Sequence, residues 1–121
     1  MCLSITSIDH VQVAAPPGSE GDARAFYGGL LGLAEIAKPV ELAGRGGCWF
    51  RVGGQELHVG VEESFAPARK AHPGLVVDDL EGLRARLAVA GIEVRDDVPA
   101  GGAARFFAHD PFGNRLEFRQ G

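Results

Sequence analysis

The sequence predicts an α+β fold in which two consecutive β-α-β-β-β units form one cupped, mixed sheet. The first observation behind this prediction is a short strand pattern containing a histidine, followed in each half of the chain by a polar break and a helical stretch. The second is that each half closes with two strand patterns joined by a glycine turn. A length of 121 residues suits one compact domain that contains both units.

The first unit is expected over residues 1–63 and begins with a strand at residues 8–14. A helix is expected over residues 21–32, with Asp22 capping the free backbone N–H groups at its start. Gly32 is expected to end this helix in the left-handed conformation. Three short strands complete the unit, at residues 33–37, 48–52 and 54–59.

The second unit is expected over residues 71–121, after a linker at residues 64–70. Its first strand is predicted at residues 71–77 and its helix at residues 78–91, where leucines recur at helical spacing. Asp78 or Asp79 is expected to cap this helix and Gly91 to end it. The remaining strands are predicted at residues 92–95, 105–108 and 113–118.

The repeat brings together four side chains of metal-ligand type. When the two units are aligned, His10 falls on His72 and His58 falls on Glu117. If the units pack about a pseudo-twofold axis, these four side chains converge on one point. Imidazole and carboxylate groups suit a divalent Zn, Mn, Ni, Co or Fe(II) ion, which is the cofactor that the sequence predicts.

Strand alternation places these residues on a polar face. Residues two apart in a strand share a face, so His58 lies with Glu56, and Glu117 lies with Arg115. The opposite face carries apolar residues and is expected to meet the helices, whereas the polar face is expected to line a binding cavity. The apolar positions of the two closing strands are Leu57, Val59, Val61, Leu116 and Phe118.

The sequence resembles the vicinal-oxygen-chelate superfamily, also called the glyoxalase/bleomycin-resistance/dioxygenase superfamily. The residues that carry the resemblance are 8–11, 25–33, 55–59 and 110–117. It implies two βαβββ modules that cup a divalent metal, with ligands at the positions of His10, His58, His72 and Glu117. It also implies a small oxygenated substrate that chelates the metal through adjacent oxygens.

Several residues are candidates for the chemistry around the metal. Glu56 shares the face of His58 and is the first candidate for a catalytic base, with a released His58 as the second. The substrate pocket is expected to include Gln12, Trp49, Arg51 and Arg115, and Arg45 is a further candidate for an anionic substrate.

Three classes of function stay open at this point. A glyoxalase-like lyase or isomerase is the first hypothesis and a ring-cleaving or other dioxygenase the second. The third is a small-molecule-binding protein without catalysis, of the antibiotic-resistance type, or a fold relic whose ligand residues hold nothing. Pairing of the two modules within one chain and across two chains both stay open, and a homodimer is expected because a cupped sheet this small leaves exposed edges.

Composition narrows the partners. The net charge is −4 and no basic block is present, which argues against nucleic acid. No apolar run reaches membrane-spanning length, and residues 1–7 lack the features of a signal peptide. Cys2 and Cys48 show no paired spacing, so neither a disulfide framework nor a thiolate metal site is expected. A cytoplasmic protein that binds a small molecule is the simplest expectation.

Overall fold

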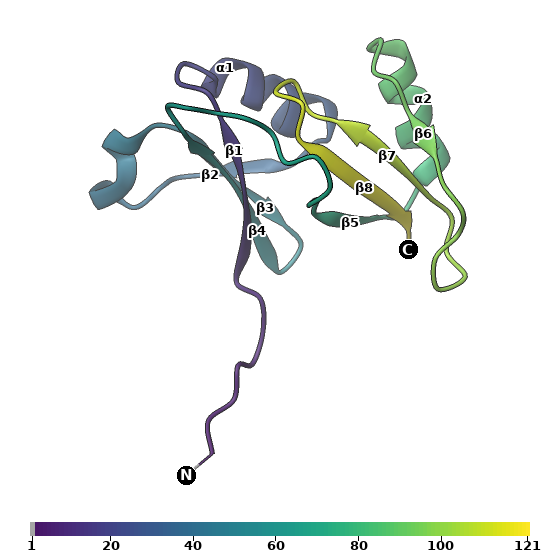
Figure 1. Cartoon of the computed structure of the whole chain (residues 1–121), viewed down its shortest axis with the longest axis horizontal. Helices are drawn as coiled ribbons and strands as arrows, with labels where there is room; N and C mark the ends of the chain where they lie inside the picture. Colours follow the sequence, from purple (N-terminus) through teal and green to yellow (C-terminus); the bar gives the residue numbers. More distant parts are fainter. Residues whose placement is uncertain (1) are drawn as a thin grey trace.

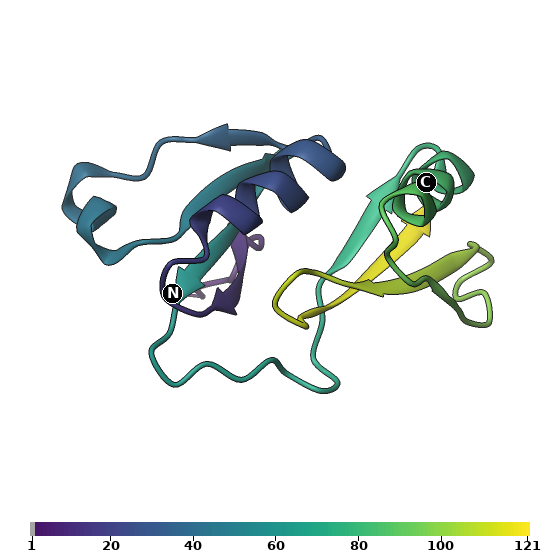
Figure 2. The same ribbon diagram turned by 90° about the horizontal axis from the view of Figure 1, so that it is seen from above.

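The computed structural model describes residues 2–121 and confirms the predicted fold class (Figure 1). Two four-stranded mixed sheets have the strand orders β1-β4-β3-β2 and β5-β8-β7-β6. Figure 2 shows the two units side by side, joined by the long segment that follows β4. The elements in chain order are β1 (His10–Ala15), α1 (Glu20–Ala23), the π-helix η1 (Arg24–Leu30), β2 (Ala34–Ile36), the 3₁₀ helix η2 (Val40–Arg45), β3 (Cys48–Val52), β4 (Gln55–Val61), β5 (Gly74–Val77), α2 (Leu80–Val89), β6 (Arg95–Asp96), β7 (Arg105–His109) and β8 (Arg115–Gln120).

The strand register supports the alignment of the two repeats. In the first unit, β1 runs parallel to β4 and Gln12 lies opposite His58. In the second unit, β5 runs parallel to β8 and Gly74 lies opposite Glu117. Gln12 and Gly74 each follow a histidine by two residues. His10 and His72 are therefore equivalent positions, and so are His58 and Glu117.

The apolar face of each sheet builds a core shared by both units. Leu57 and Val59 of β4 are buried, as are Leu116 and Phe118 of β8, which confirms the predicted parity of these strands. Leu80, Leu83 and Leu87 of α2 pack into the same cluster. The polar face of each sheet is thereby turned away from this core.

The first helix differs from its prediction. It begins at Glu20 after the N-cap residue Ser19, so Asp22 lies inside the first turn, and the expectation that Asp22 caps the helix was wrong. Gly18 has a φ of 78°, a conformation that glycine adopts without strain, and this turn starts the helix earlier than predicted. Past Ala23 the helix widens into the π-helix η1, where the Leu31 N–H donates to the Phe26 carbonyl.

The second helix matches its prediction more closely. The Asp79 side chain caps α2 by accepting a hydrogen bond of 2.9 Å from the Gly82 N–H. Gly91 follows the helix with a φ of 77°, and Gly32 follows η1 with a φ of 74°, as the sequence predicted for both.

A buried hydrogen-bond network joins the two units. The Tyr27 hydroxyl, from η1, donates to Asp110 in the β7–β8 turn over 2.6 Å. The Asn114 side chain in the same turn donates to the Ala14 carbonyl of β1 over 2.7 Å and to Asp110 over 2.8 Å. Burial, together with the charge of Asp110, raises the pKa of Tyr27 well above its ordinary value, so Tyr27 stays a neutral donor.

The chain before β1 projects away from the body as an extended arm (Figure 1). Leu3 and Ile5 in this arm are 90% and 96% exposed. Within residues 2–121, none of the helices combines the length and the apolar character that crossing a membrane requires.

Candidate metal centre

Three rings stack on the polar face of the first sheet. Trp49 of β3 lies directly opposite His58 of β4, and their ring centroids are 3.7 Å apart with planes 3° from parallel. The other side of the His58 ring faces His10, at a centroid distance of 4.2 Å and an angle of 14°. His58 is therefore only 4% exposed although it lies on the polar face.

Glu56 engages His58 on this face. The two residues are one pleat apart on β4, and His58 Nε2 donates to a carboxylate oxygen of Glu56 over 2.9 Å. Glu56 is half-buried and lies opposite His10 in the strand register. A carboxylate and an imidazole in direct hydrogen-bond contact are a pair that can accept and pass on a proton.

A carboxylate with one imidazole and two guanidinium neighbours occupies the equivalent face of the second sheet. His72 Nε2 lies 3.1 Å from Glu117 Oε1, and His72 Nδ1 donates to the Lys70 carbonyl over 2.8 Å. The guanidinium groups of Arg105 and Arg119 lie 3.4 Å and 3.7 Å from the two Glu117 oxygens. Glu117 is buried, and these partners balance its charge.

His10 and His72 share a feature that His58 lacks. His10 Nδ1 donates to the Asp9 carboxylate over 2.9 Å, and His72 Nδ1 donates to the Lys70 carbonyl, so Nε2 is the nitrogen that would coordinate an ion in both residues. Nε2 of His72 lies against Glu117, the neighbouring carboxylate. Histidines that bind a metal usually hold their second nitrogen in this way. Because the lone pairs of an imidazole lie in the ring plane, the stacked rings of His10 and His58 cannot both point at one ion.

The predicted ligands form two pairs within one chain. Over residues 2–121, no three His, Cys, Asp or Glu side chains lie close enough together to hold an ion. One pair, His10 and His58, belongs to the first unit, and the other, His72 and Glu117, belongs to the second.

The predicted pocket residues lie on the same two faces. Gln12 and Trp49 line a cavity of about 250 Å³ beside His58. Arg51 is exposed and lies opposite Glu56 in the register. The Arg115 guanidinium lies 4.0 Å from the centroid of the Phe107 ring.

Sequence reasoning missed Lys38 and Leu42, which also line the 250 Å³ cavity. The 3₁₀ helix η2 places Leu42 there, and Lys38 lies two residues before this helix. No strand or helix periodicity in the sequence signals so short an element.

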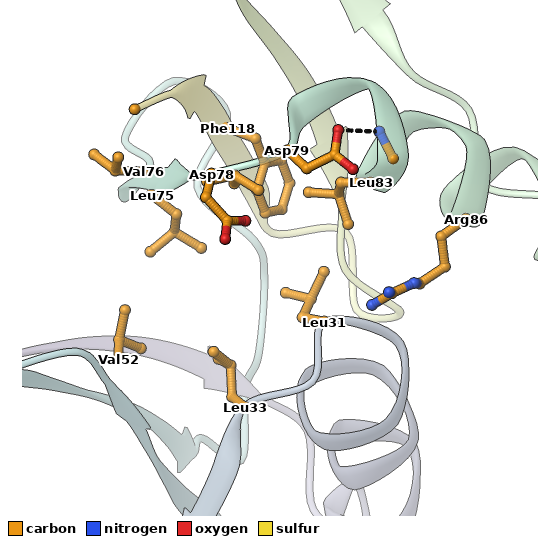
Figure 3. Close-up of a pocket in the computed structure, with 13 residues that line it drawn as sticks. Leu31, Leu33, Val52, Leu75, Val76, Asp78, Asp79, Leu83, Arg86 and Phe118 are labelled. Carbon is orange, nitrogen blue, oxygen red and sulfur yellow. Dashed lines mark hydrogen bonds between the residues drawn. The ribbon is translucent and has the colours of Figure 1, made fainter.

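A larger cavity of about 550 Å³ lies between the two units (Figure 3), and none of the described residues that line it is a histidine. Leu31, Leu33 and Val52 of the first unit face Leu75 and Phe118 of the second across it. Two of its charged side chains have structural roles, since Asp79 caps α2 and Arg86 donates to the Leu30 carbonyl. Asp78 also lines the cavity, and most of the other lining residues are apolar.

The sequence matches the Glyoxalase/Bleomycin resistance protein/Dioxygenase superfamily over residues 7–118. The chain belongs to this superfamily. No curated protein matches it. The match covers both units, so the whole repeat, including all four predicted ligand positions, lies within the superfamily domain.

Solved structures of the superfamily have the same fold. A glyoxalase family protein from Bacillus anthracis is 52% identical, with a TM-score of 0.94, and the match covers 99% of this chain and 98% of that chain. Lactoylglutathione lyase from Agrobacterium tumefaciens is 22% identical, with a TM-score of 0.73 and coverage of 97% and 95%. A fosfomycin resistance protein from Listeria monocytogenes, complexed with Mn(II) and dihydroxypropylphosphonic acid, is 15% identical, with a TM-score of 0.79 and coverage of 98% and 94%.

Proposed function

We propose that this chain is a divalent-metal-dependent enzyme of the superfamily, with His10, His72 and Glu117 as the metal ligands. The observation that carries the proposal is the anchoring of both histidines through Nδ1, with His72 Nε2 held 3.1 Å from an oxygen of the buried Glu117 carboxylate. Two imidazoles and one carboxylate form a ligand set with open positions for a chelating substrate. The Mn(II) complex of the Listeria protein, which shares the fold, is consistent with this ligand chemistry.

The metal centre is proposed to assemble between two copies of the chain. His10 and the pair of His72 and Glu117 belong to different units, and residues 2–121 of one chain contain no group of three donors. Two features favour a homodimer. The edges of β1 and β5 each lack a neighbouring strand on one side, and the apolar side chains of Leu3 and Ile5 are exposed.

The reaction is proposed to be a lyase or isomerase step on a small oxygenated substrate. A bound divalent ion supplies Lewis acidity that polarises a substrate oxygen. Glu56 would accept a proton from one atom of the substrate and return it to another, and His58, which donates its Nε2–H to Glu56, would hold the carboxylate in place. Trp49 covers one face of the His58 ring and shields that ring from water.

A dioxygenase is the second candidate. The set of His10, His72 and Glu117 has the composition of the two-histidine, one-carboxylate group that holds Fe(II) in oxygen-using enzymes. Metal identity separates the two candidates: retention of Fe(II) with oxygen uptake supports the dioxygenase, whereas activity with Zn, Ni or Mn without oxygen uptake supports the lyase or isomerase.

Mixing two defective variants tests the proposed metal centre and the cross-chain arrangement together. His10→Ala and His72→Ala are purified without a His tag, unfolded together, refolded as a mixture, and analysed for bound metal. In a cross-chain dimer, each mixed pair contains one site with both histidines intact and one site with neither. Each variant alone should bind almost no metal, and the refolded mixture should recover part of it.

Two results would contradict parts of the proposal. Recovery of no metal by the mixture, with the wild-type chain binding about one ion, would mean that the site forms within one chain. Failure of the wild-type chain to bind any of the five metals on reconstitution would remove the enzyme proposal and leave a non-catalytic binder as the better account. Refolded wild-type chain carried through the same procedure is the control.

A further inference from the structure

The 250 Å³ cavity beside the proposed metal centre has charged residues at its rim, and its floor is the polar face of the first sheet. Gln12 and Trp49 lie opposite His58 on the two neighbouring strands, and Gly60 lies one pleat beyond it on β4. All three therefore share the face of His58. Lys38 and Arg45, from the segment between β2 and β3, line the same cavity.

Glycines hold the charged rim close to the sheet. Gly47 has a φ of 80°, and a Cβ built on it would lie 2.1 Å from the Val59 carbonyl oxygen, so only glycine permits this approach. The Glu20 carboxylate accepts a hydrogen bond of 2.6 Å from the Gly47 N–H. The Lys38 ammonium donates to the Gly46 carbonyl and thereby closes the loop that carries Arg45.

The charge of the rim is only partly balanced. The Gly47 N–H is the main cause that lowers the pKa of Glu20, with smaller contributions from nearby cations that include Lys38, so this ionised carboxylate offsets the Lys38 charge. Arg45 is exposed and forms no ion pair with any residue among 2–121. An excess positive charge therefore faces a cavity in a protein whose net charge is −4.

We propose that this cavity, between Trp49 and the Lys38–Arg45 rim, binds the anionic group of a small oxygenated organic acid. A guanidinium and an ammonium together recognise carboxylate or phosphate-like oxygens. The volume of about 250 Å³ is below that of a complete ligand site, so it suits one functional group of a substrate. The stack of Trp49, His58 and His10 leads from the cavity toward the proposed metal centre, where the rest of the substrate would lie.

This inference rests on the proposed function, because it assigns the substrate class of that same site. It makes Arg45 a residue that determines specificity for acids over neutral compounds. A carboxylate and a phosphate-like group both present small anionic oxygens to the cavity. Titration with phosphate and with acetate distinguishes which of the two groups it binds.

Trp49 is the only tryptophan of the chain, so its fluorescence reports directly on this cavity. Metal-free protein is titrated with inorganic phosphate, acetate and neutral acetamide at constant ionic strength. We expect a saturable change with phosphate or acetate and none with acetamide. Arg45→Gln should raise the half-saturation concentration of the anion at least tenfold. Arg69 is an exposed arginine outside the cavity, so Arg69→Gln should have the same half-saturation concentration as the wild-type chain.

The result separates this inference from the metal proposal. Equal anion responses in the wild-type chain and Arg45→Gln, or no saturable response to either anion, would overturn the inference. Because the titration uses metal-free protein, a chain that takes up metal but ignores both anions would keep the proposed enzyme and lose the anion site. A chain that binds an anion through Arg45 but takes up no metal would keep the anion site and lose the proposed metal centre.

Discussion

The two units have the same strand arrangement but carry different kinds of side chain at equivalent positions. His58 in the first unit corresponds to Glu117 in the second, and Glu56 corresponds to Arg115, because the pairing registers of β4 and β8 are the same. In the first unit the carboxylate accepts from the imidazole one pleat away. In the second unit the carboxylate lies at the imidazole's position, and its histidine partner comes from the segment before β5.

The same contrast extends to the neighbouring positions. Trp49 and Phe107 are equivalent aromatic residues, since each lies opposite the central ligand-type residue of its sheet. Gly60, two residues after His58, corresponds to Arg119, whose guanidinium lies 3.7 Å from Glu117. In the first unit the Gln12 side chain lies over this position, whereas in the second unit an arginine occupies it.

This difference explains why the two units need each other under the proposed function. The first unit offers one anchored histidine, a proton acceptor and an open cavity, and the second offers a histidine with a carboxylate. Neither unit alone has the three donors that a catalytic divalent ion requires. If both units carried the same residues at these positions, each would offer the same incomplete set of metal donors.

The largest expected effect comes from removing the equivalent residues His58 and Glu117 in turn. We expect Glu117→Ala to lose bound metal, because the only carboxylate ligand is gone, whereas His58→Ala should retain about as much metal as the wild-type chain. Elemental analysis after dialysis measures both. Loss of metal in both variants would make His58 a ligand after all and would remove the proposed contrast between the two units.

The next effect concerns the turnover number of the enzyme and compares Glu56 with Arg115. Glu56→Gln should lower kcat about 10²–10⁴-fold, the usual contribution of a positioned general base, with metal content unchanged. Arg115→Gln, at the equivalent position, should affect kcat less, because its guanidinium packs on Phe107 and has no carboxylate partner among residues 2–121. Equal losses in the two variants would argue against Glu56 as the base.

An intermediate effect is expected from the network that joins the two units. Tyr27→Phe removes the hydrogen bond to the buried Asp110 carboxylate and should lower the free energy of unfolding by about 1.5–3 kcal/mol. Urea unfolding followed by circular dichroism measures the change. An unchanged unfolding midpoint would mean that the contacts between the units do not depend on this bond.

The raised pKa of Tyr27 adds a pH dependence with a definite sign. The unfolded chain loses the Tyr27 proton above about pH 10, while the folded chain keeps it. Stability from this group is therefore complete below pH 10 and is lost as the pH rises further. The stability of Tyr27→Phe should fall less steeply than that of the wild-type chain over the same range.

The sequence was sufficient to predict the repeat, because the spacing of the polar and apolar residues in β4 and β8 depends only on strand alternation. The positions of His10, His58 and Glu117 in the register follow from the same alternation. His72 lies two residues before β5, although the sequence predicted a strand over residues 71–77. The contacts of His58 could not be predicted this way. Its stacking between Trp49 and His10 depends on the order of three strands and on side-chain rotamers.

The ends of the helices were predicted correctly in one case and wrongly in another. Asp79 was correctly named as one of two possible caps, because the leucine spacing of α2 is regular. Asp22 was wrongly predicted as the cap, because the first helix begins at Glu20, after the turn at Gly18, and widens into a π-helix, which the apolar spacing does not reveal. The 3₁₀ helix that carries Arg45 left no periodic signal, although Arg45 itself was a candidate for anion binding.

The smallest expected effect tests the position of Gly60 in the first unit. In Gly60→Ala, an ideal Cβ would lie 2.5 Å from the Gln12 amide nitrogen, so this flexible side chain must move into the cavity. Anion binding reported by Trp49 should weaken by about tenfold or less, while the free energy of unfolding changes by no more than ~1 kcal/mol, because replacing a strand glycine offsets the displacement of Gln12. Gly54→Ala, where an added Cβ meets nothing within 4 Å, is the matched control. Unchanged anion binding in Gly60→Ala would mean that the space above Gly60 is not where the anion lies, and the contrast with Arg119 would then concern packing alone.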